Sequence, residues 1–144
     1  MSKLKNYTTS VPAMQSVGEI QAILAKHGIT DIGLKFADGK PTGITFTAFL
    51  LGKPQKFEIE CKAQAVLGVL QASKVEPRYR TVDHATNVGW RILKDLIDAQ
   101  MASVAIEQME LAQAFFGFAL DASGKTSYQI FIENRQKQLT EGKQ

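Results

Sequence analysis

The sequence has little that would tie it to a metal, a disulfide or a membrane. Its 144 residues include one cysteine, Cys61, which excludes an intramolecular disulfide and an all-cysteine zinc site. The two histidines, His27 and His84, have no cysteine or acid at ligand spacing, so no metal site is expected. No apolar run reaches the roughly eighteen residues of a transmembrane helix, and no signal-peptide core follows the N-terminus. We therefore expect a cytoplasmic protein with no cofactor and no membrane.

The sequence also lacks a large excess of either positive or negative charge. The 17 basic and 14 acidic side chains give a formal net charge of +3, and the two signs are interleaved along the chain. Nucleic-acid binding is therefore allowed but not required. The composition, with 44% hydrophobic residues, is typical of one globular domain. We expect a flexible or extended arm at residues 1–15, a single domain at 16–139 and a frayed tail at 140–144.

The first half of the chain changes its hydrophobic period once. Ser16 and Glu19 fit a capping box, and apolar residues at helical spacing follow, which predicts a helix from 17 to 27 that ends before Gly28. Three segments with a period of two then follow, separated by turns at 38–41 and 51–54. This pattern predicts a three-stranded antiparallel meander with one apolar face.

The second half returns to helical spacing. We expect a helix over 62–72, a polar loop at 73–80 and helical character from 82 to 116. Such a helix would be roughly 50 Å long, whereas a compact domain of this length is only about 37 Å across. The helix therefore either breaks, near Ser103, or projects and pairs with a second chain. The predicted interface residues of a homo-oligomer are Met101, Ile106, Met109, Phe115 and Phe116.

A turn at 121–125 precedes the last segment. Thr126 and Gln129 fit a second capping box, which predicts a short final helix, and a strand at 128–132 is the alternative. The fold class expected from the whole chain is α+β. It has an N-terminal helix, the meander, and two or three further helices, one of them long and packed on the sheet, with Trp90 as a core anchor.

One short pattern resembles half of a nuclease site. In Glu60-x-Lys62, the carboxylate would hold Mg²⁺ and the lysine would position the attacking water. A second acid is needed on the neighbouring strand, but the sequence there is Lys40-Pro41, and Asp38 lies in the turn. A single carboxylate holds a divalent ion poorly, so an exposed charged strand is the favoured interpretation and an enzyme is not expected.

A basic cluster is the most interesting feature of the second half. Arg78 and Arg80 flank the ring of Tyr79, and Arg91 and Lys94 lie one helical turn apart. Guanidinium groups bind phosphates in a bidentate manner, and an aromatic ring offers a surface for base stacking. The alternative is a solvated loop in which Arg91 pairs with Asp95 or Asp98. The predicted anion or nucleotide site is Lys74, Arg78, Tyr79, Arg80, Arg91 and Lys94.

A second, weaker site lies on the polar face of the predicted sheet. Its residues resemble those of single-strand-binding sheets, although Glu58 and Glu60 on the same face argue against an anion. These secondary candidates are Lys35, Thr45, Thr47, Phe49 and Lys56.

Two stretches carry a resemblance to known proteins. The start Lys5-Asn6-Tyr7-Thr8-Thr9 and the run Trp90-Arg91-Ile92-Leu93-Lys94-Asp95 resemble a group of short bacteriophage and prophage proteins. The resemblance covers most of the chain. It implies a phage accessory protein in the cytoplasm of a host cell. It gives no indication of an activity or of functional residues.

These observations lead to one function and two alternatives. We expect a non-enzymatic accessory protein that binds an anionic ligand, foremost single-stranded DNA, as a small homo-oligomer. The first alternative is an anti-defence protein that sequesters a small nucleotide signal at a subunit interface. The second is a protein–protein inhibitor of a host enzyme.

Overall fold

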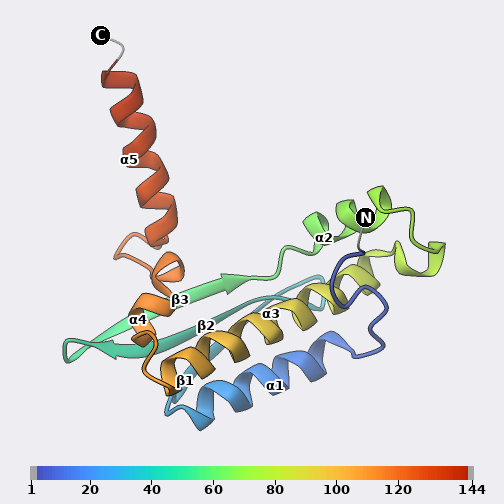
Figure 1. Cartoon of the computed structure of the whole chain (residues 1–144), viewed down its shortest axis with the longest axis horizontal. Coiled ribbons are helices and arrows are strands. Elements are labelled where there is room, and N and C mark those ends of the chain that lie inside the picture. The colour runs from blue at the N-terminus through green and yellow to red at the C-terminus, as the bar shows by residue number, and fades with distance from the viewer. Residues whose placement is uncertain (1–2, 143–144) are drawn as a thin grey trace.

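The computed structural model describes residues 3–142 and confirms the α+β class (Figure 1). An N-terminal helix precedes a three-stranded sheet, and a long helix and shorter ones follow. In chain order, the elements are α1 (Ala13–Lys26), β1 (Asp31–Ala37), β2 (Lys40–Leu50), β3 (Lys53–Glu60), α2 (Ala63–Ala72), the 3-10 turn η1 (Pro77–Tyr79), α3 (Val82–Ala105), α4 (Leu111–Ala114), the 3-10 turn η2 (Phe116–Phe118) and α5 (Ser127–Glu141).

Two tight turns fix the register of the sheet. The strand order is β1-β2-β3, and both pairs are antiparallel. Asp38 and Gly39 form the first turn, and Leu51 and Gly52 the second, all with positive φ. Positive φ at both central residues matches the twist of a two-residue hairpin. Between β1 and β2, an irregularity at Lys35 and Phe36 then shifts the register by one residue, so Phe46 lies opposite Ile32. On its other side Phe46 lies opposite Phe57, and these side chains share one face.

Helices α1 and α3 lie side by side on this apolar face (Figure 1). Trp90 of α3 is fully buried, and its indole N–H donates to the carbonyl of Pro41 at 2.9 Å. This confirms its predicted role as a core anchor. A smaller cluster lies between α2, η1 and the first turn of α3. Its buried members are Leu70, Val75 and Ala85, and Leu4, Tyr7, Val66, Leu67 and Tyr79 pack against it.

The start of α1 differs from the prediction. The helix begins at Ala13 rather than 17, and its N-cap residue is Pro12. The predicted capping box is wrong because Ser16 lies inside the helix and is fully buried. The amide of Ala13 instead donates to the side chain of Asn87 at 2.8 Å, a partner 74 residues away. The last three residues of the predicted arm, 13–15, therefore belong to the first turn of a packed helix.

The long helical segment is interrupted close to the predicted position. Helix α3 ends at Ala105 after 24 residues, about 36 Å, so it fits within the domain. The amide of Gln108 donates to the carbonyl of Ser103, and Glu107 has positive φ, which turns the chain. Phe115 returns to the core and packs edge-on against Phe46. The alternative of one projecting helix over 82–116 is therefore wrong.

The last helix stands away from the rest of the molecule (Figure 1). The predicted capping box between Thr126 and Gln129 is present at the start of α5, which excludes the alternative strand. None of its described residues is buried. The helix continues to Glu141, so residues 140 and 141 of the predicted frayed tail are helical, and residues 143–144 lie outside the described part of the chain.

Two helical glycines should respond to alanine in opposite ways. A Cβ at Gly89 would lie 2.8 Å from Sγ of Cys61, whereas a Cβ at Gly18 has no atom within 4 Å. We expect Gly89→Ala to lower the free energy of unfolding by about 1 kcal/mol through overpacking. Gly18→Ala should raise it by up to about 1 kcal/mol through helix propensity. Urea unfolding of both variants tests this, and shifts of the same sign would contradict it.

Candidate functional site

The segment from residue 73 to 80, here called the basic segment, lies at one end of the molecule and contains η1. Lys74, Arg78 and Arg80 are exposed on it. Arg78 forms an ion pair with Glu76 at 2.9 Å. Within residues 3–142, neither Lys74 nor Arg80 pairs with a carboxylate. The segment therefore presents more positive than negative charge to solvent.

Tyr79 anchors the basic segment to the body of the protein. Its ring is half-buried and meets the ring of Tyr7 edge-on, with centroids 5.7 Å apart. The ring of His84 lies 5.0 Å away, and the guanidinium of Arg78 lies 4.7 Å from the Tyr79 centroid. His84 in turn bonds to the carbonyl of Tyr7. The tyrosine ring is thus contacted on several sides, and the side chain of Arg78 that lies over it is exposed to solvent.

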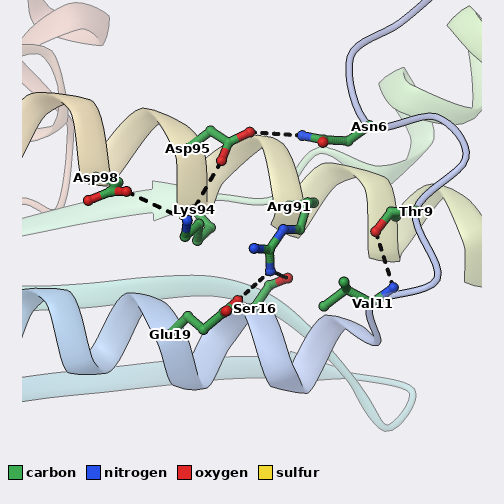
Figure 2. A network of polar contacts seen from close by, with 9 residues as sticks. All are labelled: Asn6, Thr9, Val11, Ser16, Glu19, Arg91, Lys94, Asp95 and Asp98. Carbon is green, nitrogen blue, oxygen red and sulfur yellow. Dashed lines mark hydrogen bonds and ion pairs between the residues drawn. The ribbon is translucent and has the colours of Figure 1, made fainter.

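Arg91 and Lys94 belong to a different network (Figure 2). The guanidinium of Arg91 pairs with Glu19 of α1 and donates to the hydroxyl of Ser16 at 3.2 Å. Lys94 lies 3.6 Å from Asp98 and 3.9 Å from Asp95. The sequence-based alternative that paired Arg91 with Asp95 or Asp98 is therefore wrong. Glu19 of α1 neutralises Arg91, and the acids of α3 itself neutralise Lys94. The structure does not bring either cation to the basic segment.

Asp95 ties the N-terminal residues to α3. Its carboxylate accepts a hydrogen bond from Asn6 at 3.0 Å and pairs with Lys5 at 3.3 Å. Burial alone would raise the pKa of Asp95, but the hydrogen bonds from Asn6 and Lys5 and the charges of Lys5 and Lys94 outweigh it and lower the pKa. The ionised carboxylate therefore stabilises the fold.

The nuclease-like pattern lines a hollow of about 550 Å³ between the first hairpin turn, the end of β3 and the start of α3. Asp38, Glu60 and Lys62 all border it, together with Lys40, which pairs with Asp83 of α3. Among residues 3–142, no group of three or more histidine, cysteine or acidic side chains is arranged to hold a metal ion. Two carboxylates and two lysines make this hollow neutral rather than anion-selective.

Cys61 borders the same hollow but is not set up as a nucleophile. Burial raises the pKa of its thiol to about 11. The group therefore stays protonated at neutral pH, and a thiol is a much weaker nucleophile than a thiolate. Its position beside Gly89 indicates a packing role.

The secondary sheet-face candidates do share one face, as predicted. Lys35, however, pairs with Glu58, and Thr45 is only 8% exposed. Phe49 is 78% exposed, and Lys56 is exposed beside it. The register adds Asp31 to this face, a residue that sequence reasoning missed although it alternates in phase with Lys35. Mixed charges make the face a poor site for an anion.

The predicted homo-oligomer interface is wrong at two of its residues. Met101 and Phe115 are fully buried in the core of the single chain. Ile106 is 76% exposed and Phe116 65%, and Met109 is half-buried. These three remain surface positions, but they come from the connections around α4 and not from one helical stripe.

No family model matches the chain, and no curated protein and no solved structure is significantly similar to it. No helix within residues 3–142 is both long and apolar enough to span a membrane.

The ionisation of Asp95 predicts a pH dependence of stability. Its pKa is lower in the folded protein than the value of about 3.9 in the unfolded chain. The stabilisation is thus fully present above that unfolded value and is lost as the pH falls through the lower folded value. At pH 7, Asp95→Asn should lower Tm by about 3 °C, and this difference should shrink at pH 3. Thermal unfolding followed by circular dichroism at both pH values checks this. A difference that grows at low pH would contradict it.

Proposed function

We propose that this chain binds single-stranded nucleic acid through the basic segment, as a non-enzymatic accessory protein of phage type in the cytoplasm of a host cell. One observation carries the proposal. Three exposed cations, Lys74, Arg78 and Arg80, lie within seven residues on a segment that contains a single acid, Glu76. Contacts of such cations with phosphates supply most of the affinity for a single strand.

The anchoring of the segment supports this proposal. Because Tyr79 is packed against Tyr7 and His84, the flanking cations project from a held backbone. Less conformational entropy is then lost on binding. The guanidinium plane of Arg78 offers one face on which a base can stack, since Arg stacks on aromatic systems. Exposed cations with no base-specific hydrogen-bond pattern favour binding without sequence preference.

The two alternative functions stay predictions. A sequestered nucleotide would need a site whose net charge is positive, and the hollow that contains Lys40 and Lys62 also contains Asp38 and Glu60. Inhibition of a host enzyme would use exposed apolar residues instead of the basic segment. Neither alternative has an observation in its favour as specific as the clustered cations.

Salt dependence of binding tests the proposal quantitatively. Three neutralised phosphates predict a slope of log affinity against log salt of about −2, so affinity should fall about twentyfold between 50 and 200 mM salt. Arg78→Ala with Arg80→Ala should reduce the slope to about −0.7. Fluorescence anisotropy of a labelled oligothymidylate measures both, and a mononucleotide competitor tests the nucleotide alternative.

The matched control is the pair Lys26→Ala and Lys137→Ala. These lysines are exposed at the end of α1 and on α5, so the control removes the same charge outside the basic segment. It should keep the wild-type slope. Equal losses in the two double variants would reject the site, and the absence of oligonucleotide binding at 50 mM salt would reject the function.

A further inference from the structure

The sheet face that α1 and α3 leave uncovered, here called the open face, carries charges in an ordered pattern. The register places Asp31 and Lys56 on either side of Thr47 of β2. At Gly43, which is four residues along β2 and about 13 Å away, Lys35 and Glu60 lie on either side of the strand in the same way. Each row has one acid and one base, and the order of signs is reversed between the two rows.

The middle row between these charges is neutral, because its one charged side chain is paired. It consists of Gly33, Thr45 and Glu58. A Cβ at Gly33 would lie 2.7 Å from Oγ1 of Thr45, so the glycine cannot be enlarged without displacing the threonine. Glu58 of β3 pairs with Lys35 of β1 across the intervening strand β2, which neutralises it. The centre of this face therefore carries no net charge that would oppose a second surface.

The hairpin between β2 and β3 ends in an apolar tip. Leu51 is 95% exposed, Phe49 78% and Leu50 40%. Lys53 and Lys56 lie beside them, and no acidic residue occurs between residues 39 and 57. The tip is thus both apolar and basic, and the monomer buries little of it.

A groove of about 340 Å³ lies further along β3, between that strand and the start of α5. Phe118 and Tyr128 form apolar parts of its lining, and Glu60 supplies a negative charge, since Glu58 is paired with Lys35. Lys62 also borders it. The groove and the tip lie toward opposite ends of β3 and have complementary character.

We propose that the open face binds a second copy of this chain around a two-fold axis that runs parallel to the sheet and perpendicular to its strands. Rotation about this axis places β1, β2 and β3 each over the same strand of the second copy. The row of residues at one end of the strands then faces the row at the other end in the second copy. Lys56 then faces Glu60 of the second copy, and Asp31 faces Lys35 of the second copy. The apolar tip points toward the groove of the other chain. A two-fold interface must be self-complementary, and this face meets that requirement.

The charge order favours a second copy over an unrelated partner. Around the axis, Glu58 meets Glu58 of the second copy, and each retains Lys35 as its own partner. A two-fold axis parallel to the strands would match the charges differently, with Lys56 facing Asp31. That axis would leave the apolar tip away from the groove, so the perpendicular axis is the one that uses all the exposed features.

Charge reversal tests the arrangement directly. Wild-type protein should dimerise at micromolar concentration in sedimentation equilibrium, and Lys56→Glu or Glu60→Lys alone should raise the dissociation constant about tenfold or more. The double variant, Lys56→Glu with Glu60→Lys, should return it close to the wild-type value. These two residues are about 13 Å apart on one strand, so only a contact between copies can restore binding.

Further variants separate this proposal from other interfaces. Leu51→Ser should weaken the dimer without lowering the Tm measured at concentrations where both proteins are monomeric, because the side chain is exposed in the monomer. The matched control Ile106→Ser, at another exposed position, should leave the dimer intact, as should Arg78→Ala with Arg80→Ala in the basic segment. A wild-type monomer, failure of the double reversal, or rescue of Lys56→Glu by Asp31→Lys would overturn the proposal. These results do not test the proposed nucleic-acid binding, because the oligonucleotide assay measures the effect of substitutions in the basic segment.

Discussion

The position of Trp90 determines how the long helix lies on the sheet. An indole N–H buried without a partner would cost free energy, so the core accepts this side chain only where an acceptor is available. The carbonyl of Pro41 at the start of β2 is that acceptor. The hydrogen bond therefore fixes the position of α3 along the strand. Helix α1 then packs beside α3, where the pair of Glu19 and Arg91 forms.

Sequence reasoning succeeded where the determining interactions are local. The alternation in the strands and the two hairpin turns predicted the meander, and Thr126 with Gln129 predicted the start of α5. It failed where a distant residue decides the outcome. The side chain of Asn87 determines where α1 begins, and no pattern near Ala13 reveals this contact. Likewise, the apolar character of Met101 and Phe115 could not distinguish an interface from the core, since both need the same side chains.

The candidate site shows the same division. The clustering of cations in the basic segment could be predicted, because Arg78, Tyr79 and Arg80 follow one another in the chain. Helical spacing indicated that Arg91 and Lys94 share a face, but it could not indicate which neighbour that face meets. The order of charges on the open face depends on strand register, which places Asp31 and Lys56 in one row although 25 positions separate them. Such a pattern becomes visible only when the strands are paired.

The contact between Tyr7 and Tyr79 has a consequence for how the ends of the chain can be handled. The N-terminal residues contribute none of the basic segment's charge, yet they form part of the support for its ring. The rigidity of the basic segment therefore depends on residues about seventy positions upstream, near Tyr7. A protease cut after Tyr7, or a fusion partner that draws these residues away, would leave all three cations in place and would loosen the backbone that carries them.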